Sequence, residues 1–274
     1  MKISIYTMVR NGLYLDYHVV QMLKHHLPLA DEIIVNEGFS SDGTYEAIRE
    51  LDPKIKVFRE TWNPGEGPTL YAECKERARL RCTGDWCILM DCDEFIPEWE
   101  FDNIRSHLGE CEKPIIQMKY VHFYGNYKVY NKNPERSRWV VFKRSIHKNL
   151  ADIEVWGDGS NVRLKHARLE AVCSVRRFEC HHFGFVRNPA RLRQKWRIQH
   201  GLLGRKRARW DRTPGFLFDL RPHKWRDNDF LGDLAIYTGP VVRAVREEPE
   251  EFVRDKFDLY DFLVRYEREQ DGTQ

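Results

Sequence analysis

The sequence lacks several patterns that would each fix a class of protein. No stretch approaches the roughly 20 consecutive apolar residues that a membrane-spanning helix needs. The first residues enter a strand pattern directly, without a signal-peptide apolar region, so we expect a cytoplasmic protein. The seven cysteines are odd in number and form no C-x-x-C pair, which is typical of reduced thiols used as small apolar residues.

Two phosphate-binding signatures are missing as well. No G-x-G-x-x-G follows the first apolar run, and no Walker P-loop occurs anywhere. Dinucleotide oxidoreductases and P-loop phosphotransferases are therefore disfavoured, and a phosphate is more naturally held here by a metal ion than by a glycine-rich loop. The net charge is only +3, so any argument for nucleic-acid binding must come from a local patch.

The first hundred residues do contain a regular alternation of strand and helix patterns. Apolar runs predict strands at 3–9, 33–35, 55–58 and 86–90. Apolar residues at helical spacing fill the segments between them, the first at 15–26. Strands that alternate with helices indicate βαβ units and a doubly wound, mainly parallel α/β sheet. Segments 115–124 and 138–144 are predicted to extend this sheet as a hairpin.

Acidic residues follow the last of the four predicted strands. Asp91, Asp93 and Glu94 come directly after five apolar residues at 86–90. Ligands bind at the carboxyl ends of the strands in open α/β sheets, so chemistry is expected there. Two carboxylates one residue apart on an extended backbone point to the same side and repel, and a hard divalent cation relieves that repulsion. The alternative is a solvated acidic turn at the end of a strand.

Three segments together resemble family 2 glycosyltransferases of the GT-A fold. They are T-M-V-R-N at 7–11, I-V-N-E-G-F-S-S-D-G-T at 34–44 and G-D-W-C-I-L-M-D-C-D-E at 84–94. The resemblance implies a nucleotide-sugar half at 1–97 and an acceptor half at 98–186, which form one GT-A-like domain. It leaves 187–274 as a C-terminal helical, basic extension packed on that domain.

The resemblance also implies which residues bind the donor. In the family, the first loop and the acid before the S-x-D-G-T turn hold a uridine-like base and its ribose. The corresponding residues here are Thr7, Val9, Arg10, Asn11, Glu37 and Asp42. Glu37 stands where the family more often has Asp, and Lys75 stands where it often has Arg-Asn. Asp42 is equally explained as a helix cap.

The segment C-H-H-F-G-F-V-R at 180–187 is similar to an H-[YF]-G-x-x-R element of the family, whose His completes a metal site. By spacing this residue is His182, with His181 as the alternative. The implied ligands of Mn²⁺ or Mg²⁺ are Asp91, Asp93 and His182, with Asp91 also on the ribose. A pair of hydrogen-bonded core histidines is the competing explanation. A zinc site with Cys180 is disfavoured, because no second ligand pair has suitable spacing.

An inverting transfer needs a base that takes the proton of the acceptor hydroxyl. Asp158, between two glycines in the turn-rich segment 152–161, is the predicted base. Trp156 in the same segment offers an apolar face on which a sugar can stack. An Asp-Gly turn on the surface is the competing explanation.

Residues 187–226 carry thirteen Lys or Arg against two Asp, interleaved with aromatic residues. Three explanations compete: a solvated helix that covers the sheet, a lid whose Arg187 and Lys195 clamp the donor diphosphate, and a surface for a polyanionic acceptor. The acidic, amphipathic segment 247–269 is predicted to be a closing helix, which packs on the sheet or serves a homodimer.

The sequence therefore predicts a metal-dependent, inverting glycosyltransferase with a UDP-linked sugar donor. The expected hydroxyl acceptor is a surface glycan or a lipid-linked saccharide. Two alternatives stay open, which are transfer to hydroxymethylated bases of DNA and a non-catalytic module that binds nucleotides or nucleic acid. A nucleotidyltransferase is disfavoured, because the chain lacks the Gly-rich, basic loop that such enzymes carry after the first strand.

Overall fold

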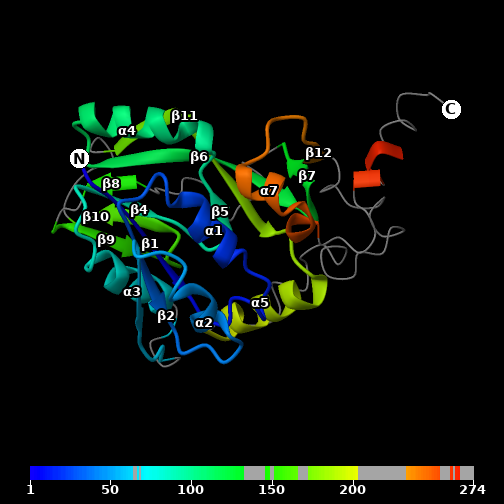
Figure 1. Cartoon of the computed structure of the whole chain (residues 1–274), viewed down its shortest axis with the longest axis horizontal. Helices are drawn as coiled ribbons and strands as arrows, with labels where there is room; N and C mark the ends of the chain where they lie inside the picture. The colour runs from blue at the N-terminus through cyan, green and yellow to red at the C-terminus, as the bar shows by residue number, and fades with distance from the viewer. Residues whose placement is uncertain are drawn as a thin grey trace.

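The computed structural model describes residues 1–63, 67, 69–132, 146–148, 151–165, 172–202, 233–253, 260–261 and 263–265. Their main feature is one mixed sheet with helices packed on it (Figure 1). Its strands follow the order β12-β7-β6-β8-β4-β1-β2-β3, with β11 beside β6 and β5 beside β11.

The first hundred residues form the parallel part of this sheet. Its strands are β1 (Ile3–Val9), β2 (Glu32–Glu37), β3 (Ile55–Arg59) and β4 (Trp86–Leu89). The helices between them are α1 (Val19–His26), α2 (Thr44–Ile48) and α3 (Leu70–Arg79). The strands pair in parallel in the order β3-β2-β1-β4. The predicted doubly wound sheet is thereby confirmed.

Alternation along the strands explains why both faces of this sheet are covered. Ile33 and Val35 pack in one apolar cluster with side chains of α1 and of helix α4 (Phe101–Glu110). Ile34, between them, packs in a second cluster with α3 and with the hairpin of β9 (Ile153–Trp156) and β10 (Asn161–Leu164). Strands buried on both faces read as continuous apolar runs, as seen in the sequence.

After β4 the strands of this sheet pair mostly in antiparallel fashion. They are β5 (Glu94–Phe95), β6 (Ile115–Tyr124), β7 (Asn126–Asn131), β8 (Ile146–Lys148), β11 (Val172–Phe185) and β12 (Leu234–Ile236). The short helices of this part are η2 (Glu98–Glu100), α7 (Arg243–Glu247) and η7 (Pro249–Phe252), and the longer one is α5 (Pro189–Leu202). β6 pairs with β7 and β8, and β11 runs parallel to β6. Of the predicted hairpin, 115–124 is a strand and 138–144 lies outside the described residues.

The C-terminal segment contributes to the same sheet and core. β12 pairs antiparallel with β7, although it lies beyond residue 187, where we expect the extension to begin. Phe252 of η7 is fully buried against Phe95, Phe183 and the ring of His18. The division of the chain at residue 187 stays a prediction. We predict a closing helix at 247–269. Its described part contains the last residue of α7, all of η7, and helical residues at 260–261 and 263–265.

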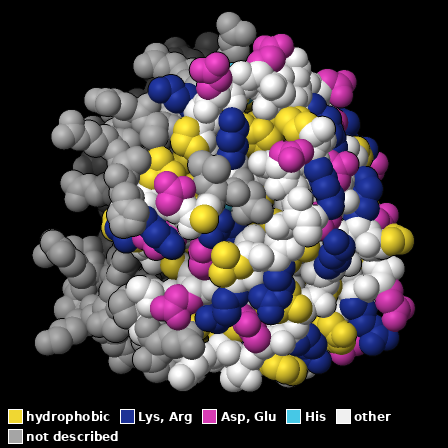
Figure 2. All heavy atoms as spheres, turned by 90° about the vertical axis from the view of Figure 1, so that its left-hand side faces the viewer, with side chains coloured by type: hydrophobic (Ala, Val, Ile, Leu, Met, Phe, Trp, Pro, Cys, Tyr) yellow, Lys and Arg dark blue, Asp and Glu magenta, His cyan; other side chains and the backbone are white. Residues whose placement is uncertain are grey.

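In the part of the chain that the structure describes, no helix is long and apolar enough to cross a membrane. The face shown in Figure 2 mixes Lys and Arg side chains with Asp and Glu side chains over the described residues.

Candidate active site

Asp93 lies at the centre of the site, in the turn between β4 and β5. Only 2% of the residue is exposed. Its carbonyl oxygen accepts a hydrogen bond from the backbone nitrogen of Phe183 at 2.8 Å. His182 is paired with Glu94 where β5 and β11 run side by side. Strand pairing therefore brings two sequence segments, 91–94 and 180–187, to the same point.

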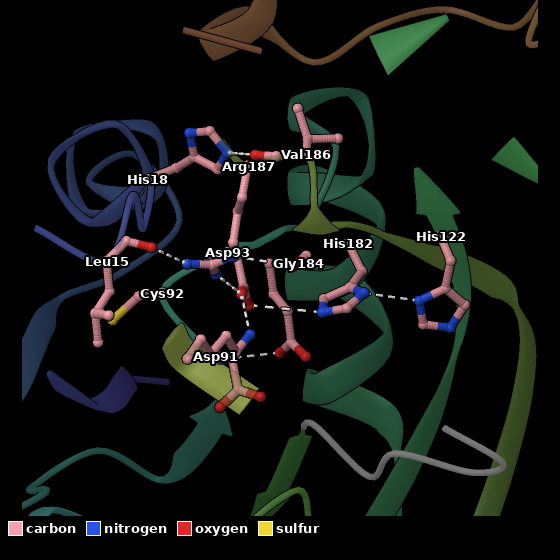
Figure 3. A network of polar contacts seen from close by, with 12 residues as sticks. Leu15, His18, Asp91, Cys92, Asp93, His122, His182, Gly184, Val186 and Arg187 are labelled. Atoms are coloured by element: carbon pink, nitrogen blue, oxygen red, sulfur yellow. Dashed lines mark hydrogen bonds and ion pairs between the residues drawn. The ribbon is translucent and has the colours of Figure 1, made fainter. Parts of the chain in front are cut away.

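Three side chains converge on the Asp93 carboxylate (Figure 3). Arg187 donates to Oδ2 through Nη2, and Lys195 donates to the same oxygen through Nζ at 3.3 Å. His182 Nε2 lies 3.6 Å from Oδ1. The structure thus gathers one acid, one imidazole and two cations, all four of which the sequence predicts as site residues.

Arg187 is held rigidly in this cluster. Its Nε donates to the carbonyl of Gly184 at 2.9 Å, and its Nη1 donates to the carbonyl of Leu15 at 2.8 Å. The guanidinium lies 3.8 Å from the ring centre of Tyr17, close enough for a cation–π contact. No motif marks Tyr17 in the sequence, and only its position just before the first helix could have drawn attention to it.

Lys195 comes from α5, which begins at Pro189, two residues after Arg187. Burial, and then the positive charge of Arg187, lower the pKa of Lys195 to about 8. The helix is fixed to the loop after β1, because Asn188 N donates to Asp16 Oδ2 at 2.7 Å and Tyr14 Oη donates to Gln194 Oε1 at 2.8 Å. This docking keeps the lysine beside Asp93.

The two candidate histidines lie on opposite sides of β11, because neighbouring side chains of a strand alternate. His182 faces Asp93, and its Nδ1 lies 2.7 Å from Nδ1 of His122 on β6. His181 faces an aromatic cluster, where burial lowers its pKa to about 3. Its Nδ1 has no hydrogen-bond partner among the described residues. The geometry favours His182 over His181.

Asp91 is bonded to a different cation. Lys75, buried on α3, donates to Asp91 Oδ1 and also to the carbonyl of Gly159 at 2.9 Å. Gly159 belongs to the turn between β9 and β10, so Lys75 joins this turn to the D-x-D segment. The neighbouring Asp158 is exposed, and its Oδ1 accepts from Ser160 N at 3.1 Å. The role of Asp158 as the base stays a prediction.

The residues predicted to bind the base and ribose lie at the ends of β1 and β2. Asn11 has a left-handed backbone with φ 51°, its nitrogen donates to Ser40 Oγ at 2.7 Å, and its Oδ1 accepts from Ser41 N at 2.9 Å. These bonds join the loops after β1 and β2 into one edge. Thr7 is buried with Oγ1 3.6 Å from Cys92 Sγ, Val9 is buried and Arg10 is exposed.

Glu37 and Asp42 organise the second of these loops. The Glu37 carboxylate accepts from Phe39 N at 3.1 Å, Ser40 N at 2.6 Å and Arg59 Nε at 2.6 Å. Asp42 accepts from Tyr14 N at 2.7 Å and, two residues on, from Thr44 N at 3.1 Å. Arg59, at the end of β3, was not predicted. The sequence indicates Arg59 only indirectly, as a basic residue at the end of the strand that pairs with the strand of Glu37.

The side chains around Asp93 offer oxygen and imidazole nitrogen atoms that could bind a divalent cation. Among the described residues, no three His, Cys, Asp or Glu side chains lie close enough to form a metal cluster. Asp93 and His182 nevertheless suit a divalent cation, because a carboxylate oxygen and an imidazole nitrogen are both ligands that Mn²⁺ accepts. A Cβ on Gly184 would overlap Nε2 of His182 and would lie 3.3 Å from Asp93 Oδ2, so a glycine here makes room for the His182 ring beside Asp93. The part of Asp91 in metal binding stays a prediction.

Comparison with known proteins gives one family and several structures. The sequence profile of glycosyl transferase family 2 matches residues 17–167, which is more than half of the 274 residues. No protein with a curated description matches the sequence. The family match includes the S-S-D-G-T turn and the D-x-D segment, and it ends before His182.

The similar structures include TarS residues 1–349 from S. aureus with UDP-GlcNAc, at a TM-score of 0.47 and 15% identity, covering 100% of this chain and 84% of that one. A second structure of S. aureus TarS is matched over 49% of its chain. Glucosyl-3-phosphoglycerate synthase from Mycobacterium tuberculosis, in complex with Mn²⁺, UDP-glucose and phosphoglyceric acid, gives a TM-score of 0.44 at 17% identity. That match covers 74% of this chain and 80% of the other.

Proposed function

The chain belongs to glycosyl transferase family 2, and we propose that it moves a sugar from a UDP-linked donor to a hydroxyl acceptor in a metal-dependent, inverting reaction. The observation that carries this proposal is the convergence of His182, Arg187 and Lys195 on Asp93. A buried carboxylate with an imidazole on one oxygen and two cations on the other is suited to a diphosphate and its counter-ion.

Charge builds on the diphosphate as the bond from the anomeric carbon to its oxygen breaks. Asp93 and His182 would hold Mn²⁺ or Mg²⁺, which as a Lewis acid offsets this charge. Arg187 cannot move without losing two backbone carbonyl partners, so it holds Asp93 in place. Lys195 is a flexible point charge whose Nζ is 3.3 Å from Asp93, and it is able to turn toward a phosphate oxygen.

The nucleoside is assigned to the edge formed by the loops after β1 and β2. Thr7, Val9, Arg10 and Asn11 lie on the first loop or lead into it, and Glu37 and Asp42 lie on the second. Bonds of Asn11 to Ser40 and Ser41 fix the two loops relative to each other. A rigid edge of this kind binds a ribose and a base without the entropy loss of ordering two loops.

The acceptor is assigned to the side of the β9–β10 turn. Asp158 would take the hydroxyl proton while the acceptor oxygen forms its bond to the anomeric carbon and the diphosphate leaves. Lys75 supports this placement, because it bonds to the turn at Gly159 and to Asp91. Trp156 is 49% exposed beside this turn and offers a face for a sugar ring. A surface glycan or a lipid-linked saccharide is the acceptor class we expect first.

The test compares Asp93→Asn and His182→Gln with the wild type. Asparagine keeps an acceptor for the buried Arg187, whereas an alanine would leave that cation unpaired at a cost of roughly 3–5 kcal/mol. We expect Mn²⁺-dependent binding of UDP, measured by calorimetry, to disappear in both variants and to persist in Asp102→Asn, an exposed change on α4. If both variants bind UDP with Mn²⁺ as the wild type does, the metal assignment is wrong.

Donor turnover tests the enzymatic part separately. The wild type should release free UDP from its cognate UDP-sugar, slowly, with water as the acceptor. The donor is identified by testing a panel of UDP-, GDP- and other activated sugars with Mn²⁺ for binding and hydrolysis. If no sugar nucleotide in the panel is either bound or hydrolysed, the proposed donor class is wrong.

A further inference from the structure

A second histidine lies behind the candidate metal ligand. His122 of β6 and His182 of β11 are paired residues of two parallel strands, and both are buried, with 1% and 7% of the residue exposed. Their Nδ1 atoms lie 2.7 Å apart, with the ring planes at 82° (Figure 3). The His122 ring in turn stacks at 18° on the ring of Tyr120, which limits its rotation.

A bond between two Nδ1 atoms can contain only one proton. If both nitrogens carried hydrogen they would repel, and if neither did, two lone pairs would face each other at 2.7 Å. Two arrangements are therefore available. Either His182 donates through Nδ1 and keeps the lone pair on Nε2, or His122 donates and the His182 proton lies on Nε2.

The choice between them decides whether His182 can bind a cation. Its Nε2 is the atom that points toward Asp93 Oδ1, at 3.6 Å. An imidazole binds a metal through a lone pair, so Nε2 must be free of hydrogen and Nδ1 must carry it. Metal-binding histidines in general donate their other N–H to a fixed acceptor.

We propose that His122 is a positioning residue that accepts the Nδ1 hydrogen of His182 and so keeps Nε2 ready for the divalent cation. The inference rests on the proposed metal-dependent function. It also assigns the tautomer of His122, whose own proton is then on Nε2. The total protonation of the pair is unchanged, and only the position of the hydrogens is selected.

Two substitutions separate the hydrogen bond from the packing. His122→Phe keeps a ring of similar size against Tyr120 and removes the acceptor. His122→Asn places an amide oxygen near the position of Nδ1 and restores an acceptor. With UDP present, and with free Mn²⁺ followed by electron paramagnetic resonance, we expect His122→Phe to bind Mn²⁺ roughly 10–100-fold more weakly than the wild type. His122→Asn should recover most of this loss.

The outcomes distinguish this inference from the proposed function. If the wild type binds no Mn²⁺, the metal-dependent function is wrong, and the role of His122 with it. If wild type and His122→Phe bind Mn²⁺ equally, only the role of His122 is wrong. Nitrogen-15 NMR of the histidine side chains in the wild-type protein gives a test that needs no variant to fold. A proton on Nε2 of His182 in the Mn²⁺-free protein with UDP would overturn the proposed tautomer.

Discussion

Each oxygen of the buried Asp93 carboxylate has its own partners. Its Oδ2 accepts from Arg187 and Lys195, and its Oδ1 faces His182. A carboxylate removed from water needs such partners, because an unpaired buried charge is strongly destabilising. Arg187 is satisfied in turn by two carbonyls and the ring of Tyr17. Arg187 and Asp93 therefore hold each other in place.

Gly184 provides a test at this scale. In Gly184→Ala the new methyl group would overlap Nε2 and Cε1 of His182, so the imidazole must turn away from Asp93. We expect Mn²⁺-dependent UDP binding, measured by calorimetry, to fall by at least about tenfold, the loss typical when a residue that orients a metal ligand is changed. Gly109→Ala, near the end of α4 with no atom within 4 Å of the added carbon, is the control and should bind normally. Normal binding by Gly184→Ala would contradict the proposed role of His182 as a metal ligand.

Local sequence motifs predict residues that the structure brings together, but they do not predict the long-range partners of these residues. Asp93 and His182 were predicted from D-x-D and H-F-G-x-x-R, and alternation along β11 explains why His182 and not His181 faces Asp93. The sequence does not predict Tyr17 or His122, because each contacts a residue of the site that lies far away along the chain. Such contacts are set by strand order, which no local pattern contains.

Among the elements, β1, β2 and the turn before β4 are joined by one buried acid. The Glu32 carboxylate accepts from Ser4 Oγ at 2.7 Å, Thr83 N at 2.6 Å and Lys56 Nζ at 2.6 Å. Ser4 Oγ also accepts from Gly84 N at 2.8 Å. Burial alone would raise the pKa of Glu32, but the bonds from Lys56, Ser4 and Thr83 outweigh it and lower the pKa to about 2.

Glu32→Gln tests this network through its pH dependence. The pKa of the folded protein lies below the ordinary value of 4.5, so the stabilisation is complete above that pH and is lost as the pH falls toward 2. We expect the variant to lose about 2 kcal/mol of unfolding free energy at neutral pH. The amide nitrogen of glutamine is a hydrogen-bond donor, and it would face groups of Ser4, Lys56 and Thr83 that donate to the carboxylate in the wild type. In urea titrations, the gap between wild type and variant should narrow from pH 4.5 downward. A gap that is constant with pH would refute the assignment, and Glu110→Gln, exposed on α4, should show no gap.

Element boundaries illustrate what a sequence pattern can and cannot predict. The apolar runs identified β1 to β4, because strands buried on both faces need them. The helix predicted from residue 15 begins instead at Val19. Residues before it turn through the left-handed conformation at Asn11 and Asp16, with φ of 51° and 59°. A left-handed residue at 16 cannot belong to a right-handed helix, which is why the helix starts late, and the same turn places Leu15 O and Tyr17 against Arg187.

At the scale of the whole molecule, charge is nearly balanced. The chain has 45 Lys and Arg against 42 Asp and Glu. The face shown in Figure 2 mixes both signs over the described residues, which does not resemble an extended phosphate-binding surface. The basic tract at 187–226 is described only as far as residue 202, where Arg193 and Arg197 of α5 are exposed. Its other predicted roles, including the polyanion surface, stay predictions, as does a homodimer.

The charge of the surface bears on whether DNA can be the acceptor of the sugar. DNA affinity falls with salt at a slope of about 0.9 per phosphate neutralised, so a face on which cations and carboxylates are mixed, as on the described residues of Figure 2, should bind weakly and with a shallow slope. We therefore expect no sugar transfer to duplexes containing 5-hydroxymethyl pyrimidines, and none to unmodified duplexes, while UDP release in the same tubes shows that the enzyme is active. A shallow slope that is unchanged in the double variant Arg193→Gln, Arg197→Gln would agree with this. Sugar transfer to the hydroxylated duplex alone, with a steep slope that this double variant reduces, would instead make DNA the acceptor and α5 part of the surface that binds it.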